Sequence, residues 1–212
     1  MNYYIIGSGG FAKEVYFLAD ESLPETHVFK GFIDKTPETD TILVRGRNEP
    51  VIAEDTFLEQ FKGQAIALFI GLGDPKIIRK IGEKYEKFEF PNLIHPNLVY
   101  DSRSVSLGKG NIITSGCNFT VDIEIGDFNI FNLDSTLGHD CVIGNFNVFN
   151  PGTQVSGGVK IGDANLFGTN CAILQYMEVG SGSILGAGGL LTKSLASNTL
   201  AVGVPASFRS LG

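Results

Sequence analysis

A large apolar residue returns at every sixth position through the second half of the chain. An α-helix would place such residues three and four apart, whereas six is a multiple of the strand period of two and returns each side chain to one face. This segment is therefore predicted to be β-structure. The repeating positions are Leu107, Ile113, Phe119, Ile125, Phe131, Leu137, Ile143, Phe149, Val155, Ile161, Phe167, Ile173, Val179 and Leu185.

Glycine and asparagine recur there with a longer period of eighteen residues, which is three hexads. Coils stacked at the strand spacing of about 4.8 Å would arrange them in ladders, with glycines at tight corners and asparagine amides bonded above and below. The pattern predicts a triangular solenoid, whose narrow interior Cys117, Cys141 and Cys171 would fill. The ladder residues are Gly108, Gly126, Gly144, Gly162 and Gly180, and Asn111, Asn129, Asn147 and Asn165.

The first half instead alternates short apolar runs with helical patterns. Apolar runs at 2–6, 28–33 and 65–71 predict strands, and the patterns at 11–20 and 75–85 predict helices. About two βα units and a partial third result, which is a small Rossmann-like α/β domain. A proline-containing connector lies between the two architectures, and we assign residues 1–95 to the first domain and 96–212 to the solenoid with its closing segment.

Composition narrows the possible functions. The chain has 212 residues, of which 43% are hydrophobic and 18% charged, so it can bury a core. Its net charge of −7 argues against nucleic acid as a partner. Without a long apolar run or a signal-peptide pattern, we expect a cytoplasmic protein that does not engage a membrane. The spacing of the three cysteines suggests neither a disulfide framework nor a metal site, so no metal is expected.

A glycine loop follows the first predicted strand. Residues 7–12, Gly-Ser-Gly-Gly-Phe-Ala, fit G-x-G-x-x-G/A, in which backbone N–H groups approach a phosphate at a helix N-terminus. Asp34 ends the next apolar run, where an acid would bond a ribose or base, although it could equally be a turn residue. A dinucleotide fold needs about 150 residues, so one nucleotide fits the first domain better than NAD.

Of the three histidines, only His139 lies in the repeat; His27 and His95 lie outside it. His139 is predicted at a coil corner with its side chain pointing outward, next to Asp140. Transfer of an acyl group needs a proton acceptor near neutral pH, and a neighbouring carboxylate raises the basicity of an imidazole and fixes its tautomer. The alternative is a solvated corner histidine without a role.

The hexads IGDFNI, IGNFNV and IGDANL resemble the repeat of the left-handed β-helix acyltransferases, and AVGVPASFRS is similar to their closing segment. Together with the glycine loop, the whole arrangement resembles the sialic acid O-acetyltransferase and nucleotide-amino-sugar N-acetyltransferase family. The resemblance implies a nucleotide-linked sugar in the first domain and acetyl-CoA between neighbouring solenoids. It also implies a homotrimer with active sites at the subunit interfaces.

The same resemblance assigns roles by position. His139 matches the general base, Asp140 its supporting acid, and Asn132 a polar residue near the reacting centre. Two positions depart from the family pattern, since Lys35 stands where a second acid is common and Val148 where a histidine is common. The substrate positions are Gly9, Gly10, Phe11, Asp34, Lys35 and Gly71, and the acetyl-CoA positions are Val148, Thr169 and Ala187.

These features predict an acetyl-CoA-dependent N-acetyltransferase that acts on the 4-amino group of a nucleotide-linked deoxy sugar. The amine would attack the thioester directly, without a cysteine nucleophile, and an unidentified backbone N–H would stabilise the oxyanion. O-acetylation of a sialic-acid-type sugar is the nearest alternative. A nucleotide-binding oxidoreductase and a noncatalytic solenoid scaffold are alternatives from other classes.

Overall fold

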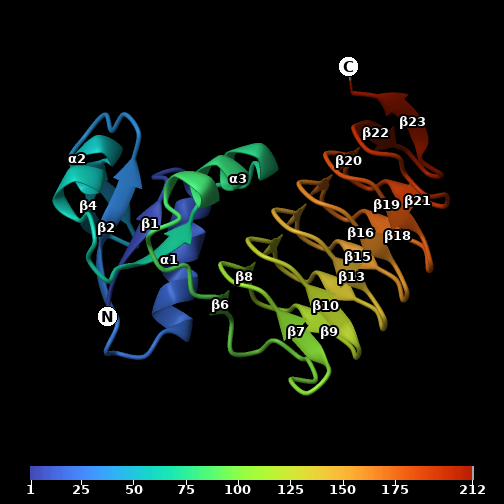
Figure 1. Ribbon diagram of the computed structural model, residues 1–212, viewed down its shortest axis with the longest axis horizontal. Coiled ribbons are helices and arrows are strands. Elements are labelled where there is room, and N and C mark those ends of the chain that lie inside the picture. The colour runs from blue at the N-terminus through green and yellow to red at the C-terminus, as the bar shows by residue number, and fades with distance from the viewer. Residues whose placement is uncertain (212) are drawn as a thin grey trace.

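The computed structural model describes residues 1–211, which form an α/β domain beside a β-solenoid (Figure 1). The first domain has one five-stranded sheet in the order β3-β4-β2-β1-β5. Its pairs are parallel except for the β3–β4 hairpin. The elements are β1 (Asn2–Ile6), α1 (Gly10–Ser22), β2 (Val28–Asp34), β3 (Thr41–Val44), β4 (Arg47–Ala53), α2 (Glu54–Gln60), β5 (Ala67–Ile70) and α3 (Pro75–Lys84).

The predicted strands and helices of this domain are confirmed to within two residues at each end. The β3–β4 hairpin and α2 had not been predicted. The hairpin turns at Arg45 and Gly46, whose φ angles of 49° and 78° are both left-handed. The two strands bury only Val44 and Val51 fully, so they carry little regular hydrophobic alternation by which the sequence could have revealed them.

The solenoid consists of stacked coils that each contribute short parallel strands to three sheets (Figure 1). The first sheet contains β7 (Val105–Leu107), β10 (Ile123–Ile125), β13 (Val142–Ile143), β16 (Lys160–Ile161) and β19 (Glu178–Val179). The second contains β9 (Asn118–Phe119), β12 (Thr136–Leu137), β15 (Gln154–Val155), β18 (Ala172–Ile173) and β21 (Leu190–Leu191). The third contains β6 (Leu93–Ile94), β8 (Ile112–Ile113), β11 (Ile130–Phe131), β14 (Val148–Phe149), β17 (Leu166–Phe167), β20 (Ile184–Leu185), β22 (Thr199–Val202) and the antiparallel β23 (Ser207–Ser210).

Strand pairing follows the predicted period, because each paired residue of one coil lies opposite the residue eighteen positions later, in the next coil. The apolar hexad residues are buried, apart from the partly buried Leu107. Phe131, Phe149 and Phe167 stack with ring centroids 4.5 and 4.7 Å apart. The three cysteines are free and buried, as predicted. The interior is therefore a column of side chains in register.

The asparagine ladder is also confirmed. Asn147 donates its side-chain N–H to Asn129 Oδ1 at 3.0 Å, and Asn165 donates to Asn147 in the same way. The glycine ladder has a different cause from the one predicted, because none of its members has a positive φ. A Cβ on Gly126 would come within 3.0 Å of the next coil, so these glycines allow close stacking rather than tight turning.

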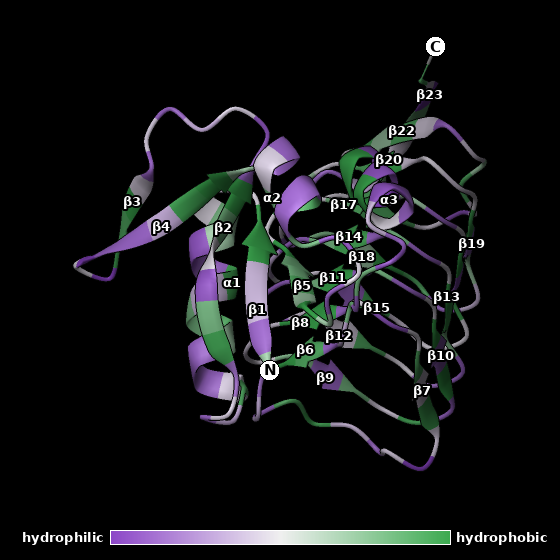
Figure 2. Ribbon diagram, turned by 60° about the vertical axis from the view of Figure 1, so that its left-hand side comes forward, coloured by the Kyte–Doolittle hydropathy of each residue, from purple (hydrophilic) through white to green (hydrophobic). Residues whose placement is uncertain are grey.

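The α/β domain packs on the third sheet of the solenoid. Ile112, Ile130 and Val148 project from that sheet into the domain's own hydrophobic core. Helix α3 adds Arg79, whose guanidinium lies 5.2 Å from the Phe146 ring centroid. Figure 2 shows apolar strands where the two parts meet. β6 already pairs with β8, so the solenoid sheet begins just before the domain boundary that we placed after residue 95.

Candidate functional site

The glycine loop joins β1 to α1 and leaves the start of that helix open. Gly9 is the N-cap, no side chain caps the helix, and its first turn carries no acidic residue. A Cβ added at Gly9 or Gly10 would meet nothing within 4 Å. The space beside Gly9 and Gly10 at the start of α1 is therefore open, and the helix dipole there favours an anion such as a phosphate.

Asp34, at the end of β2, lies beside this loop. It accepts hydrogen bonds from the Ser8 hydroxyl and, at 3.1 Å, from the Thr36 N–H. Two cavities meet at Asp34. One of about 360 Å³ is polar and includes Thr36, and the other of about 240 Å³ is mainly apolar and includes Ile77. The Thr36 bond is the predicted turn interaction, and the cavities keep the nucleotide interpretation open.

The other predicted substrate positions differ in their surroundings. Lys35 is exposed at the rim of the apolar cavity, and Phe11 is partly buried against the domain core. Gly71 is buried, and a Cβ there would lie 2.6 Å from the Ala12 Cα. The packing of α1 on the sheet therefore accounts for this glycine without reference to a ligand.

His139 lies on an outer corner of the solenoid, as predicted. The side chains of His139 and Asp140 are 54% and 64% exposed, and His139 Nδ1 is 2.7 Å from Asp140 Oδ2. Asp140 has a φ of 58°, one of the left-handed corner residues of the repeat. When Nδ1 donates its proton to this carboxylate, Nε2 keeps its lone pair and can act as a proton acceptor.

Gly157 determines where the imidazole can lie. It stands eighteen residues after His139, one coil further along the same corner, and a Cβ there would come within 2.5 Å of His139 Nε2. Tyr176, in the coil that follows Gly158, has its ring in the space that a Cβ on Gly158 would need. We had not predicted a role for either glycine, although the eighteen-residue register points directly from His139 to Gly157.

Two corners of the solenoid border its second sheet. We call the corner at positions 121, 139, 157, 175 and 193 the histidine corner, and the corner at 133, 151, 169 and 187 the threonine corner. Backbone hydrogen bonds stack each of them, from Gly158 N to His139 O and from Gly188 N to Thr169 O. Thr169 and Ala187 are exposed on the threonine corner, and Asn132 adjoins it.

The predicted site residues are therefore not all together within one chain. Strand β12 separates Asn132 from His139 along the coil. Val148 lies apart from both corners, because its side chain is 1% exposed beneath the α/β domain. Its side chain has no free surface for acetyl-CoA in this structure.

Two further properties bear on the chemistry. Within residues 1–211, no three His, Cys, Asp or Glu side chains come together in a way that could hold a metal ion. None of the helices in that range has the length and apolar character needed to cross a membrane.

A nucleotide-type loop domain joined to a hexad solenoid with an exposed His–Asp pair defines a sugar acetyltransferase architecture, and comparison with known proteins agrees. The family described as PglD N-terminal domain matches residues 2–85. PerB from Caulobacter crescentus, solved with CoA and GDP-perosamine, is 31% identical, has a TM-score of 0.88, and matches 99% of this chain and 97% of its own.

Two other solved structures are similar over nearly the whole chain. WeeI from Acinetobacter baumannii is 27% identical with a TM-score of 0.86, covering 99% of this chain and 100% of its own. The acetyltransferase domain of PglB from Neisseria gonorrhoeae is 27% identical with a TM-score of 0.84, covering 97% of this chain and 98% of its own.

A curated relative extends the comparison to a viral protein. An uncharacterised protein of Acanthamoeba polyphaga mimivirus is 35% identical over 129 residues, which are 60% of this chain but only 24% of that protein. The chain thus spans about a quarter of this relative's length. Taken together, the comparisons show that the chain belongs to the hexapeptide-repeat sugar acetyltransferases, left-handed β-helix enzymes that use acetyl-CoA.

Proposed function

We propose that this enzyme acetylates the 4-amino group of a nucleotide-linked deoxyamino sugar, with His139 as general base. The observation that carries the proposal is the exposed His139–Asp140 pair, 2.7 Å apart, on a solenoid joined to an open helix N-terminus in the α/β domain. PerB, similar over almost its whole length, was solved with CoA and a nucleotide-linked amino sugar. The three buried, free cysteines fit a reducing compartment such as the cytoplasm.

The reaction needs one proton acceptor and no covalent enzyme intermediate. The sugar amine attacks the thioester carbonyl carbon, forming a C–N bond, while His139 Nε2 accepts the amine proton. The tetrahedral intermediate collapses with cleavage of the C–S bond, and the protonated imidazole returns a proton to the departing CoA sulfur. Asp140 stabilises the imidazolium through Nδ1.

We further propose that the working enzyme is a homotrimer in which the histidine corner of one copy meets the threonine corner of the next. This arrangement would bring Asn132, Thr169 and Ala187 of one copy to His139 of another. Exposed apolar side chains support such contacts, since Val121 and Leu174 near the histidine corner are 42% and 40% exposed.

Replacement of His139 by Asn tests the base. We expect turnover, measured as thiol release from acetyl-CoA, to fall by about 100-fold or more. His27→Asn is the matched control, because His27 lies in the α/β domain before β2 and touches no part of the proposed site. Unchanged turnover in His139→Asn would exclude this residue as the base.

A panel of acceptors tests the substrate class. Nucleotide-linked 4-amino sugars should be acetylated, and the corresponding 4-hydroxy sugars and free sialic acids should not. Turnover on hydroxyl acceptors alone would replace N-acetylation by O-acetylation while leaving the acyltransferase assignment intact.

Complementation between inactive variants tests the shared site. In mixed trimers of His139→Asn and Ala187→Trp, a site is intact only when its histidine corner comes from Ala187→Trp and its threonine corner comes from His139→Asn. Random mixing should restore about a quarter of wild-type activity. Failure to restore activity, with subunit exchange verified by mass spectrometry, would contradict a site shared between copies.

A further inference from the structure

We propose that Tyr176 is a positioning residue for His139, because its ring closes the side of the imidazole that Asp140 leaves unrestrained. Tyr176 adjoins the histidine corner at position 175, two coils beyond His139. The inference deepens the proposed function and rests on it only in taking His139 as the general base. The place of the two rings relative to each other can be tested without any turnover.

The rings of His139 and Tyr176 fill neighbouring spaces on this corner. A Cβ on Gly157 would come within 2.5 Å of His139 Nε2. A Cβ on Gly158, the next residue, would overlap Cδ1 and Cε1 of Tyr176. One coil earlier, the side chains at the equivalent two positions are close enough to bond, since His139 Nδ1 lies 2.7 Å from Asp140 Oδ2. Because successive coils repeat the same corner, the spaces over Gly157 and Gly158 adjoin as well, and so do the rings that fill them.

Backbone conformation does not account for this pair of glycines. Gly157 does not have a left-handed φ, and Gly158 has a φ of 69°. Residues with side chains adopt the conformation of Gly158 at the equivalent positions of other coils, namely Asp122, Asp140 and Tyr176, with φ angles of 56°, 58° and 60°. What distinguishes both glycines is therefore the space that they leave for the two rings.

Burial does not account for the place of the Tyr176 ring. Phe128 folds back over Gly110 in a similar way, but its side chain is only 5% exposed and belongs to the core of the α/β domain. The Tyr176 side chain is 68% exposed, the largest value for an aromatic residue within the described residues 1–211. A ring so exposed gains little from burial, so its position is better explained by the imidazole beside it.

His139 needs more restraint than its bond to Asp140 provides. Both side chains are more than half exposed, and an interaction between two exposed charged or polar groups does little to fix either of them. The imidazole can turn about its side-chain bonds toward the space over Gly158 unless another group occupies that space. The Tyr176 ring occupies it and so keeps Nε2 in one place for proton transfer.

Removal of the ring tests this role in steady-state kinetics. In Tyr176→Ala we expect kcat to fall about tenfold, with the KM for either substrate changed less than about twofold, because the ring acts through His139. Tyr176→Phe should keep the wild-type kcat, since the atoms over Gly158 belong to the ring. Tyr100→Ala, at an exposed tyrosine before β7, is the matched control and should leave all values unchanged. An unchanged kcat in Tyr176→Ala would overturn the proposal.

Gly158→Ala tests whether the ring acts from its place on the corner. The new Cβ would displace the Tyr176 ring, so this substitution should also lower kcat about tenfold. In the Tyr176→Ala background it should change kcat less than about twofold, because no ring is left to displace. Strain from alanine at a φ of 69° is common to both backgrounds and cancels in the comparison. Equal losses in the two backgrounds would contradict the proposal.

The NMR signals of the histidines give a readout that needs no turnover. The chain has three histidines, so protein labelled with ¹³C at histidine Cε1 should give three signals, and His139→Asn identifies that of His139 by its loss. A neighbouring aromatic ring shifts such a signal through its π-electrons. Tyr176→Ala should therefore move the His139 signal and leave those of His27 and His95 in place, whereas Tyr176→Phe should move none.

An unmoved His139 signal in Tyr176→Ala would overturn the proposal, even if the KM for a substrate rose. That combination would make Tyr176 a substrate contact instead, and an inactive His139→Asn would leave the proposed function standing. Full turnover in His139→Asn would remove the proposed function, and the His139 signal would still decide whether Tyr176 holds the imidazole.

Discussion

At the scale of single residues, burial makes the cysteine thiols unreactive, whereas the imidazole of His139 is exposed. Desolvation raises the pKa of the Cys117 thiol to about 12 and that of Cys171 to about 11, and it also raises the pKa of Cys141. A thiol must ionise to act as a nucleophile, so these groups are inert near neutral pH. His139 is exposed and held by Asp140, which makes it the group available for proton transfer.

Alkylation tests whether the three cysteine thiols are buried and unreactive in the native protein. At pH 8.5, iodoacetamide should leave the three cysteines of the native protein unmodified and label all three in urea, because only unfolding returns their pKa values to about 8.5. Labelling of the native protein at the rate of the unfolded chain would contradict the buried placement.

The same shifts predict how stability depends on pH. A folded-state pKa raised above the unfolded value stabilises the fold below about pH 8.5, and this contribution is lost as pH rises toward 12 in the case of Cys117. The melting temperature should therefore fall above pH 8.5. Cys117→Ala should show a weaker fall over this range than the wild type, and an equal slope would contradict the assignment.

Gly157→Ala tests the position of the imidazole. The new Cβ would lie 2.5 Å from His139 Nε2, and the exposed ring would swing outward, so we expect kcat to fall about 100-fold with little loss of stability. In Gly82→Ala the new Cβ meets the Phe128 ring at an ordinary 3.4 Å, and kcat should be unchanged. Full activity in Gly157→Ala would show that the ring needs no such space.

At the scale of elements, the asparagine ladder joins equivalent positions of successive coils and keeps the coils in register. Asn129 is fully buried, donates to the Gly144 carbonyl at 2.9 Å, and accepts the Asn147 N–H at 2.9 Å. Strands of two residues make few backbone bonds of their own. The amide side chains therefore satisfy corner groups that the strands leave unpaired.

Removing one member of the ladder should destabilise the solenoid. Asn129→Ala leaves a buried N–H and a buried carbonyl without partners, and we expect it to lower the free energy of unfolding by about 2–4 kcal/mol. Urea denaturation would measure the change. Asn118→Ala, at an exposed strand position, should cost less than about 0.5 kcal/mol, and equal losses in both variants would contradict the role of the ladder.

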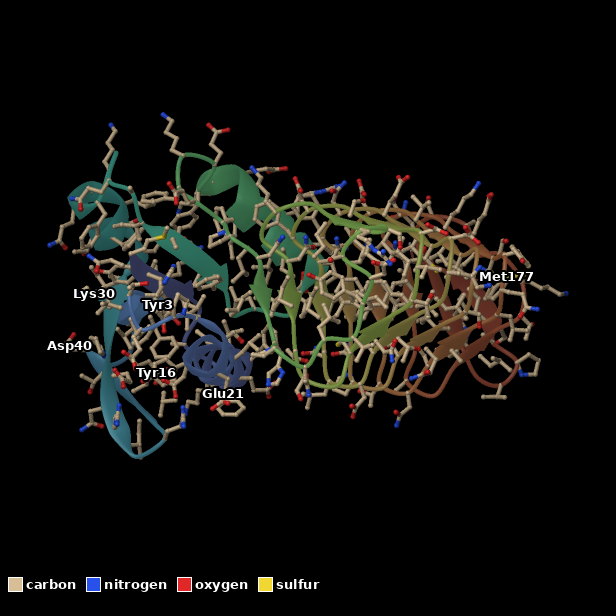
Figure 3. The ribbon with its side chains drawn as sticks, turned by 90° about the horizontal axis from the view of Figure 1, so that it is seen from below. Tyr3, Tyr16, Glu21, Lys30, Asp40 and Met177 are labelled. Atoms are coloured by element: carbon tan, nitrogen blue, oxygen red, sulfur yellow. The ribbon has the colours of Figure 1, made fainter. Side chains whose placement is uncertain are left out.

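At the scale of the whole molecule, the two parts share a core. The third solenoid sheet supplies Ile130 and Val148 to the cluster that also contains the helices and sheet of the α/β domain. Phe90 and Phe128 meet edge to face across this junction, with ring centroids 5.0 Å apart. Figure 3 shows how far the molecule extends beyond it, with Tyr3 and Tyr16 in the α/β domain and Met177 near the opposite end of the solenoid.

A buried charge at the junction should separate the two parts. We expect one calorimetric unfolding transition in the wild type and two in Val148→Asp, because the carboxylate would be desolvated beneath the α/β domain. Val99→Asp, at a side chain that is 61% exposed, should keep one transition. A single transition at the wild-type temperature in Val148→Asp would contradict a shared core.

Much of this architecture could be predicted from repetition. Every coil buries side chains at the same repeating positions. The periods of six and eighteen are therefore enough to identify the solenoid, its interior and the exposed position of His139. The β3–β4 hairpin was not predicted because its strands fully bury only Val44 and Val51 and show no regular apolar alternation. The role of Gly157 was not predicted because it depends on a neighbour eighteen residues away.

Local pattern and loop chemistry thus determined the element types, the coil register, the His139–Asp140 pair and the open helix at Gly9. Only the tertiary structure decided that Val148 lies beneath the α/β domain. The physical reason is that periodicity specifies which side chains leave the core. What covers an outward-facing side chain depends on packing between segments far apart in the chain, which periodicity does not encode.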